Sequence, residues 1–405
     1  MRTRLRFETA YDVVVCGGGM AGVAAALAAA RLGQKTCLLE KTVFTGGLAT
    51  TGNVLYYLPL SDHHGNQVTF GIAEELLRAS IHYGPGEVAG DFKTNPERRY
   101  SGEFMSAAFI LALDEVLTAA GVDLWLDTLV CAPRLSRGKL TGVEVENKSG
   151  RGLVRGKAFV DASGDADLAF RAGAPCATQL NFMSIWAVGA TPEMARSLLS
   201  ETGCAIAHGV FAAAGAWDDG SNQPAGIRQF SGVDAKDVSE FILTGRRLLR
   251  EQYRDAQAKL GPNGRRKVFP MGLPAMANFR TTRRIEARHT LANGDAFKHF
   301  DDCVGLVAEW KRGEEVWELP YRALLPPATP GLLVAGRCIG ARDDAWSVMR
   351  VIQAAAMSGE VAGVAGAMAA DRGHAPDRLP VTDLQCELKK RGFLLNVRDL
   401  GLPHN

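Results

Sequence analysis

The apolar pattern at the start of the chain predicts a strand, a helix and a second strand in direct succession. Valines occupy positions 13–15 and form the β-branched run that is typical of a buried strand. The stretch 20–32 is Ala-rich and predicts a helix, which Gly33 ends. Residues 35–39 are again largely apolar and predict a strand that ends at Glu40.

The pattern in the rest of the chain predicts further elements. Helical periodicity is clearest over 71–79 and 104–120, whereas Gly and Pro among charged residues predict a loop over 84–101. Alternation with turn signals over 122–156 predicts a small antiparallel meander inserted between the first strand–helix–strand unit and the strand at 158–160. The other expected elements are strands at 158–160, 179–188 and 331–335, helices at 192–202 and 353–369, and a Gly- and Ala-rich loop at 210–235.

Three glycines separate the first strand from the first helix. Gly17 allows a sharp turn, Gly19 lets the backbone approach a pyrophosphate, and Gly22 lets the helix pack closely on the strand. The N–H groups at the helix start would hold phosphates, and Glu40 would accept hydrogen bonds from a ribose. This order of strand, turn, helix, strand and acid predicts a dinucleotide-binding site.

Two later segments suit the same site. Residues 45–54 follow Glu40 and combine two glycines with hydroxyl and amide side chains. The predicted strand 158–160 leads into small residues and acids at 161–166. We expect both segments to lie against the bound cofactor.

Composition limits the class of protein. A chain of 405 residues, 47% hydrophobic and 22% charged, is long enough for about two globular domains. Its net charge of +2 gives no argument from the whole chain for a nucleic-acid or membrane partner, so any case for an anionic partner must be local. The eight cysteines form no CxxC pair, which is typical of reduced thiols in a cytosol and argues against a structural zinc or a redox-active disulfide.

Neither apolar stretch reads as a targeting or membrane segment. Arginines at 2, 4 and 6 precede an apolar run, but Asp12 and the glycines interrupt it, so we do not interpret it as a secretory signal. The stretch near 351–370 contains Gln353 and Glu360 and predicts a buried helix. We therefore expect a cytoplasmic protein with no membrane partner.

The series of motifs resembles that of a family of bacterial FAD-dependent oxidoreductases in the glutathione-reductase-like FAD superfamily. Residues 17–22, 46–52, 161–165 and 336–338 match its GxGxxG, GGxATxG, DA[ST]GD and GRC segments. Residues 319–322, 332–337 and 353–369 resemble its closing region, and 384–395 its terminal helix. The middle of the chain, 176–318, matches poorly.

The resemblance implies FAD rather than NAD as the cofactor. It also implies an α/β fold, in which a Rossmann-like FAD-binding domain of the ββα three-layer type carries a mixed α+β substrate domain built on an antiparallel sheet. We expect the FAD-binding domain to comprise 1–175 and 319–375, the substrate domain 176–318, and a C-terminal helical tail 376–405.

The residues expected to hold FAD lie in or near these motifs. Arg350 and the start of the following helix would place positive potential beside the pyrimidine end of the flavin, which favours the anionic reduced form. Asp344 is a candidate for contact with the ribityl chain or the substrate, and a surface helix cap is an equal alternative. The full set is Gly17, Gly19, Met20, Ala21, Gly22, Glu40, Lys41, Gly46, Gly47, Leu48, Ala49, Thr50, Thr51, Val130, Ala162, Ser163, Gly164, Asp165, Gly336, Arg337, Asp344, Arg350 and Val351.

Positive charge is concentrated between 245 and 288, where ten arginines and two lysines face three acids. The arginines at 246, 247, 250 and 254 follow a helical pattern and fit a solvated face. Arg280, Arg283 and Arg284 lie where the resembling family has an arginine pair near the flavin. They are candidates to bind a carboxylate or phosphate.

These features predict oxidation or desaturation of a small, anionic organic substrate by hydride transfer to flavin N5. The chain has no second GxGxxG unit, which argues against a built-in NAD(P)H domain. The catalytic candidates are Arg283, Tyr321, Tyr57 and His63, with packing or a surface position as the alternative for each. His63 and His64 lack a third ligand at useful spacing, so we expect no metal.

The sequence leaves other interpretations of the function open. A flavin reductase or monooxygenase fed by NAD(P)H would share the same first motif. A flavin-containing RNA-binding or RNA-modifying protein would account for the basic middle segment, although few aromatic residues lie there to stack bases. A non-catalytic flavin-binding subunit and a homodimer are also left open.

Overall fold

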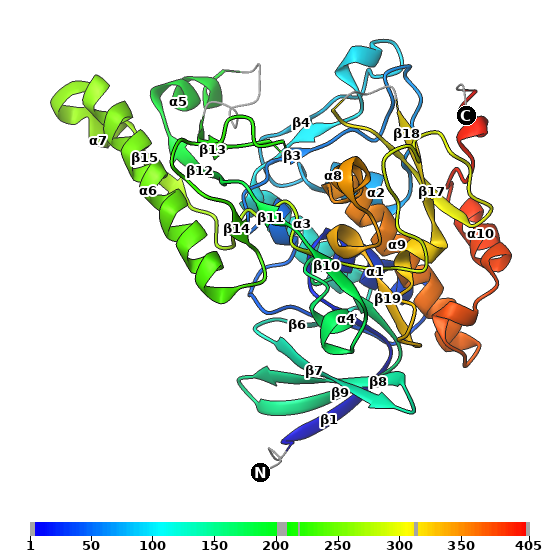
Figure 1. Ribbon diagram of the computed structural model, residues 1–405. Helices are drawn as coiled ribbons and strands as arrows, with labels where there is room; N and C mark the ends of the chain where they lie inside the picture. Colours follow the sequence, from blue (N-terminus) through cyan, green and yellow to red (C-terminus); the bar gives the residue numbers. More distant parts are fainter. Residues whose placement is uncertain (1–4, 201–208, 218, 312–314, 402–405) are drawn as a thin grey trace.

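The computed structural model describes residues 5–200, 209–217, 219–311 and 315–401. Its largest sheet has seven strands in the order β6-β2-β1-β9-β8-β7, and β19 also pairs with β9 (Figure 1). Five of these strands run parallel: β6 (Asp123–Trp125), β2 (Thr36–Leu39), β1 (Phe7–Cys16), β9 (Gly150–Asp161) and β19 (Leu332–Val334). The fold is therefore mixed α/β with a parallel-dominant central sheet, as predicted.

Strand β9 belongs to two parts of this sheet. Its first half pairs antiparallel with β8 (Lys139–Asn147), which in turn pairs with β7 (Leu129–Ser136). Its second half lies parallel between β1 and β19. The last strand of the predicted meander and the predicted strand 158–160 are thus one continuous strand. The prediction of an antiparallel meander from residue 122 was wrong at its start, because β6 runs parallel to β2.

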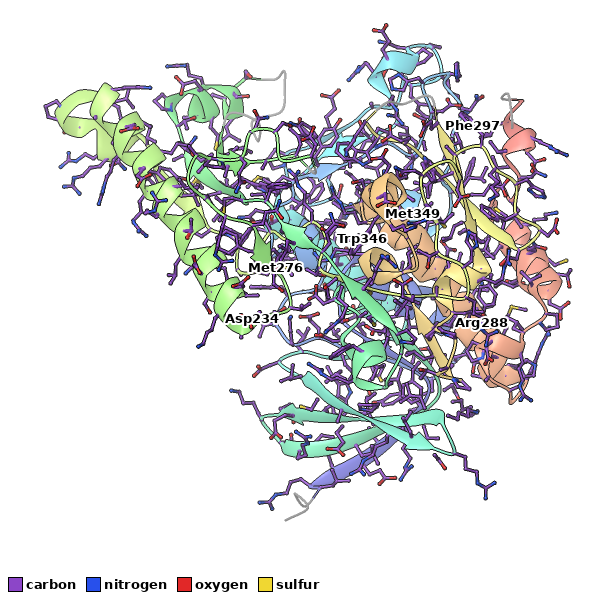
Figure 2. All side chains as sticks on the ribbon, viewed as in Figure 1. Asp234, Met276, Arg288, Phe297, Trp346 and Met349 are labelled. Atoms are coloured by element: carbon purple, nitrogen blue, oxygen red, sulfur yellow. The ribbon has the colours of Figure 1, made fainter. Side chains whose placement is uncertain are left out.

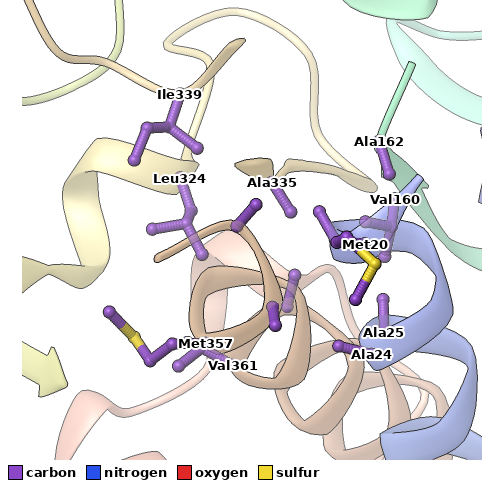
Figure 3. Close-up of a cluster of buried hydrophobic side chains, with 14 of the residues drawn as sticks. Met20, Ala24, Ala25, Val160, Ala162, Leu324, Ala335, Ile339, Met357 and Val361 are labelled. Carbon is purple, nitrogen blue, oxygen red and sulfur yellow. The ribbon is translucent and has the colours of Figure 1, made fainter. Parts of the chain in front are cut away.

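Two small-residue helices pack directly on the sheet. Helix α1 (Met20–Arg31) lies against α9 (Ile352–Asp371), and Figure 3 shows the buried side chains between these helices and β9. The helices are so close that a Cβ on Gly359 would lie 2.1 Å from the carbonyl oxygen of Ala21, and one on Gly363 2.2 Å from that of Ala25. The Ala- and Gly-rich composition of both helices is what permits this contact.

Further elements surround this first core. The predicted helices at 71–79 and 104–120 are present as α2 and α3. The resemblance predicted a terminal helix over 384–395. The structure has α10 there, but this helix ends at Lys390. These elements are α2 (Ile72–Ala79), α3 (Ser106–Ala119), α4 (Asp167–Arg171), α8 (Asp343–Met349) and α10 (Val381–Lys390), with strands β3 (Tyr56–Tyr57), β4 (Glu87–Val88), β5 (Gly102–Glu103), β17 (Cys303–Ala308) and β18 (Val316–Pro320).

A second hydrophobic core lies between Met183 and Phe279. There the 25-residue helix α6 (Ala235–Lys259) packs on a three-stranded antiparallel sheet, and Figure 1 shows this unit beside the central sheet. Its other elements are β12 (Ser184–Ala190), β13 (Val210–Gly215), β15 (Phe269–Gly272), α5 (Pro192–Leu198) and α7 (Gly264–Lys267), and the paired strands β10 (Cys176–Thr178) with β16 (Arg283–Ile285) and β11 (Leu180–Asn181) with β14 (Phe230–Ser231).

Two predictions fail in this second unit. The expected loop 210–235 contains β13 and β14, and the expected strand 179–188 is divided into β11 and β12. The predicted helix 192–202 ends at Leu198, and part of it lies outside the described residues. Ile285 and the strands β17 and β18 pack in the first core, so we favour a shorter inserted domain than 176–318.

No single helix in the described ranges is both long and apolar enough to cross a membrane. Helices α8 and α9 together meet the criteria of length and composition, but they are bent by 80° at the break between them.

Candidate FAD-binding site

A groove runs across the ends of the parallel strands, where β1 turns into α1. It contains about 1160 Å³ of empty space, including its open mouth. Segments from the β1–α1 turn, the 46–51 loop, the 162–164 loop, the 335–337 loop and the start of α9 line it. Of the residues expected to hold FAD, Gly22, Thr50, Asp165, Asp344 and Val351 do not line the groove; all the others do.

The three glycines of the first turn have different surroundings. Gly17 has a φ of +104°, and a Cβ there would lie 2.6 Å from the carbonyl oxygen of Ala162. A Cβ on Gly22 would lie 1.8 Å from the carbonyl oxygen of Gly17, so this residue sets the contact between helix and turn. A Cβ on Gly19 would meet nothing within 4 Å, which leaves its surface open to the groove.

Two helix N-termini line the groove. Helix α1 begins after Gly19 and α9 after Val351, and neither cap residue makes a side-chain hydrogen bond to its helix. Met20, Ile352 and Ala355 from the two first turns lie on the groove wall. A helix N-terminus favours negative charge, so the groove offers two positions for anionic groups.

Glu40 is buried beside the turn, and both of its carboxylate oxygens are engaged. Gly18 donates its backbone N–H to Oε2 over 2.7 Å, and Thr42 donates its N–H to Oε1 over 2.8 Å. Each oxygen keeps a further lone pair that can accept a hydrogen bond from a hydroxyl group. The backbone therefore fixes the orientation that the proposed ribose contact requires.

The 45–54 loop is attached to the glycine turn. Gly46 donates its N–H to the carbonyl of Gly18 over 2.7 Å, which brings Gly47 against Gly19. Thr50 Oγ1 donates to the carbonyl of Thr45 over 2.5 Å, and Thr51 Oγ1 to that of Gly47 over 2.9 Å. These hydroxyl groups thus stabilise the loop itself.

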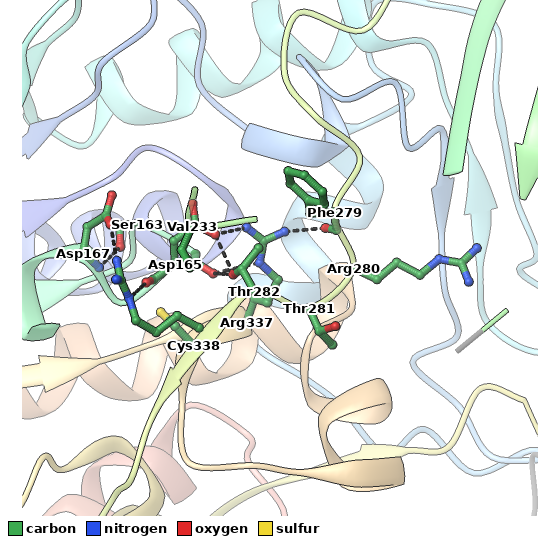
Figure 4. Close-up of polar contacts among 12 residues, drawn as sticks. Ser163, Asp165, Asp167, Val233, Phe279, Arg280, Thr281, Thr282, Arg337 and Cys338 are labelled. Carbon is green, nitrogen blue, oxygen red and sulfur yellow. Dashed lines mark hydrogen bonds and ion pairs between the residues drawn. The ribbon is translucent and has the colours of Figure 1, made fainter. Parts of the chain in front are cut away.

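Arg337 joins three segments beside the groove (Figure 4). Its Nε donates to the carbonyl of Gly164 over 2.7 Å, its Nη1 to that of Phe279 over 2.5 Å, and its Nη2 to Oδ1 of Asp165 over 2.6 Å. Thr282 Oγ1 also donates to Oδ1 of Asp165 over 2.6 Å. The Asp165 carboxylate therefore has a structural contact in the fold, outside the groove lining.

Asp161 organises the loop that follows β9. Its fully buried carboxylate accepts hydrogen bonds from the backbone and hydroxyl of Ser163 and from the N–H of Ala169. Burial raises the pKa of this carboxyl above its usual value, and these hydrogen bonds oppose the shift. Burial also raises the pKa of the Cys338 thiol, which favours the protonated, less nucleophilic form.

A family model described as FAD dependent oxidoreductase matches residues 12–181 and 207–388. The chain belongs to this family. FAD is the cofactor of this family, so we compare the residues that line the groove with the chemical groups of FAD.

The more similar curated proteins match only parts of this FAD-dependent oxidoreductase. Digeranylgeranylglycerophospholipid reductase from Thermoplasma acidophilum is 30% identical over 158 residues, which cover 38% of this chain and 39% of that protein. Thioredoxin reductase from Ureaplasma parvum is 34% identical over 74 residues, which cover 18% and 24%. The chain thus spans less than half the length of either relative.

Solved structures match over most of the chain at low identity. A geranylgeranyl bacteriochlorophyll reductase-like protein from Thermoplasma acidophilum is 14% identical with a TM-score of 0.44, covering 95% of this chain and 83% of that one. Sdh1 from Mycobacterium smegmatis is 16% identical with a TM-score of 0.46, covering 95% and 72%.

The groups that line the groove of this oxidoreductase suit FAD in their chemistry. The open surface at Gly19 and the start of α1 suit the pyrophosphate, and the held carboxylate of Glu40 suits the ribose. Arg350 and the start of α9 provide a second position in the groove, besides the start of α1, where a negatively charged group of the cofactor would be stabilised. When bound, FAD supplies an acceptor for a hydride or for electrons.

None of the four catalytic candidates lines this groove. Tyr57 and Tyr321 are buried and donate to the carbonyls of Ala73 over 2.7 Å and Pro376 over 2.9 Å. His63 lies on an exposed turn. Arg283 is buried, donates to Asp167 over 2.6 Å and lies over the ring of Phe170. The contacts of Tyr57, Tyr321 and Arg283 are structural, and a catalytic role for any of the four residues stays a prediction.

The structure separates the three arginines that the sequence suggested as an anion clamp. Arg283 pairs with Asp167, and Arg284 pairs with Glu286 over 3.1 Å. Arg280 points away from Arg337 in Figure 4, donates to the carbonyl of Ala216 and lies 5.9 Å from the ring centre of Trp217. They therefore do not act as one clamp.

Several groove residues were not predicted from the sequence. Met276, from the inserted domain, lines the groove and accepts a hydrogen bond at Sδ from Thr51 over 3.0 Å. No local motif marks it, because it reaches the groove through a long connection. The other unpredicted lining residues are Cys16, Leu39, Thr42, Thr128, Leu129, Asp167, Leu168, Arg171, Ala335, Ile352 and Ala355. Over the described ranges, no group of three or more His, Cys, Asp or Glu side chains could hold a metal.

Proposed function

We propose that the chain oxidises or desaturates a small, anionic organic substrate and passes a hydride to bound FAD. The proposal rests on the end of the groove formed by Arg350 and the start of α9. The positive potential there favours extra negative charge on a reduced cofactor, so it raises the tendency of that cofactor to accept electrons.

Arg280 supports the anionic character of the substrate. Arg280 lies between Met276, which lines the groove, and Thr282, which donates a hydrogen bond to Asp165, the ion-pair partner of Arg337. Its guanidinium lies beside Trp217, whose ring stacks with that of Trp310 at 6.2 Å. A guanidinium next to a flat apolar surface suits an organic carboxylate.

The chain holds the surrounding segments in place by hydrogen bonds between the two units. Ala275 donates its N–H to the carbonyl of Thr51 over 2.7 Å, and Asn278 Nδ2 donates to the carbonyl of Gly52 over 2.5 Å. Trp186 Nε1 donates to the carbonyl of Asn53. The 275–280 stretch is therefore fixed against the loop that lines the groove, which would orient a substrate held by Arg280.

The first experiment is an absorbance spectrum of the purified protein before and after denaturation, followed by anaerobic titration with a panel of carboxylates and amino acids. A flavin band that one panel member bleaches is the expected result and identifies the substrate class. A band bleached by NAD(P)H alone would replace the proposal with the reductase or monooxygenase alternative; the two curated relatives described above are named reductases. A folded protein without flavin would overturn the cofactor assignment as well.

A further inference from the structure

The end of α6 and the chain that follows it form a surface that is both cationic and apolar. We call residues 259–273 the basic–apolar segment; it runs from the end of α6 through α7 to the strand β15 and Leu273. Lys259, Arg265, Arg266 and Lys267 are exposed in it, and so are four large apolar side chains. These are Leu260, Phe269, Met271 and Leu273, with exposed fractions between 37% and 60%.

The charge of this segment is not balanced locally. The sequence contains no Asp or Glu from 256 to 285. Within the part of the chain that the structure describes, the four cations of the segment take part in no ion pair. A chain with a net charge of only +2 thus carries a concentrated positive surface at one place.

Two of the four apolar side chains of the segment, Phe269 and Met271, belong to a strand at the edge of a sheet. Strand β15 pairs on one side only, with β12, so it is the edge strand of its sheet. Phe269 and Met271 are exposed side chains of β15 itself, at 42% and 60%, and Leu273, exposed at 48%, follows directly after the strand. Figure 1 shows α7 at the far end of α6, and Figure 2 shows side chains projecting there from the outer edge of the molecule.

We propose that the basic–apolar segment docks the protein on an anionic phospholipid surface. Its cations would meet lipid phosphates, and its aromatic and aliphatic side chains would enter the boundary between headgroups and acyl chains. A second copy of the chain fits less well, because a symmetric contact would bring the two cationic surfaces together. RNA also fits less well, because aliphatic side chains outnumber the single aromatic one available for stacking.

The segment lies next to the groove in the sequence. Leu273 precedes Met276 by three residues, Met276 lines the groove, and Ala275 is hydrogen-bonded to the 45–54 loop. The docking surface and the groove are therefore connected by a short, fixed stretch of chain. The proposal concerns binding and does not depend on the reaction proposed above.

The test is co-sedimentation of the full-length, flavin-loaded protein with vesicles. Vesicles of phosphatidylglycerol and phosphatidylcholine in a 3:1 ratio are compared with pure phosphatidylcholine, at low and at high salt. We expect binding to the anionic vesicles only, weakened by salt. The triple variant R265Q/R266Q/K267Q should weaken it by about 100-fold, and F269S/M271S by about tenfold.

Matched controls lie on the same helix but outside the segment. Arg250→Gln removes an exposed cation of α6, and Leu243→Ser removes an exposed apolar side chain; both should bind vesicles as the parent protein does. All variants should keep their flavin content and thermal unfolding midpoint. Equal binding of all variants, absence of vesicle binding, or tighter binding to RNA than to vesicles would overturn the proposal. So would a dimer in solution that F269S/M271S converts to a monomer.

Discussion

Arg337 and Asp165 lie 172 residues apart in the sequence and form an ion pair of 2.6 Å at the edge of the groove. Both side chains are largely buried, at 9% and 21% exposure. The pair connects the loop after β9 to the loop after β19, and Arg337 also holds the inserted domain through Phe279. Removal of one partner would leave the other charge largely buried without its ion-pair partner.

We therefore expect Arg337→Met to lower the free energy of unfolding by about 3 kcal/mol and to reduce FAD occupancy. Urea unfolding and the flavin absorbance of the purified variant measure the two effects. Arg247→Met is the matched control, because Arg247 pairs with Glu251 on the exposed face of α6. It should change stability by less than about 1 kcal/mol. Similar losses in both variants would contradict a special role for the Arg337–Asp165 pair.

Alanine substitutions at two glycines, Gly19 and Gly22, should affect different properties: the stability of the apoprotein and the affinity for FAD. Gly22→Ala should destabilise the apoprotein by at least about 1–3 kcal/mol, since its Cβ would collide with the carbonyl of Gly17. Gly19→Ala should leave apoprotein stability almost unchanged, because Gly19 has a φ of −68° and an open surface. It should nevertheless weaken FAD binding by about tenfold, an effect of about 1.4 kcal/mol.

Thermal unfolding of the apoproteins and FAD titration by fluorescence distinguish these effects. If Gly19→Ala binds FAD as tightly as the parent protein, the pyrophosphate does not lie at this turn.

Glu360 should give the protein a pH-dependent stability. This carboxyl lies in α9, accepts a hydrogen bond from the N–H of Ile72 over 2.6 Å, and faces Arg391 at 3.9 Å, with Arg31 and Glu75 further away. Burial raises its pKa from 4.5 to about 7. A raised pKa in the fold means that the folded state holds the proton more tightly than the unfolded state.

The stabilisation linked to this proton is complete below pH 4.5 and is lost as the pH rises through about 7. The shift of pKa corresponds to about 3 kcal/mol. We expect Glu360→Gln to be more stable than the parent protein at pH 8 and about equal at pH 4.5, since an amide can still accept from Ile72. Denaturant unfolding from pH 4.5 to 8 measures the free energy of unfolding of both proteins, and Glu251→Gln is an exposed control. If the free energies of the parent protein and of Glu360→Gln changed with pH in parallel, this prediction would be contradicted.

Arg280→Met should raise the KM for an anionic substrate by about tenfold to 100-fold, because a hydrogen bond to a charged group contributes about 1.5–3 kcal/mol. Flavin content and spectrum should stay the same, since Arg280 does not line the groove. Steady-state kinetics with the substrate identified by titration provide the measurement, and Arg250→Met is the surface control. An unchanged KM would show that another residue binds the carboxylate.

The parts of the site that depend on local sequence were predictable. The glycine turn, Glu40 and the small-residue helix of 353–369 each follow from residues close together in the chain, and the structure has α1, β2 and α9 within a few residues of the predicted limits. The cofactor and the family follow from the same motifs.

The failures arise where distant contacts decide the structure. Strand β13 consists mostly of Ala and Gly, which have low strand propensity, and it exists because β12 pairs with it. Tyr57 and Tyr321 were attractive as catalytic residues by type alone. Their hydroxyl groups bind the carbonyls of Ala73 and Pro376, which are partners that only the folded chain reveals.

The pairing of β9 with β19 has a consequence for how the protein is made. It joins residues 159–161 to 332–334, and α9, which supplies the second helix N-terminus of the groove, is later still. The inserted core between Met183 and Phe279 is contiguous and can form earlier during synthesis, whereas the apolar face of α1 must wait for its partner. Nascent chains should therefore expose α1 until α9 has been synthesised, and we expect flavin to be loaded only after that point. Flavin occupancy thus reports how much of the synthesised protein has closed its central sheet.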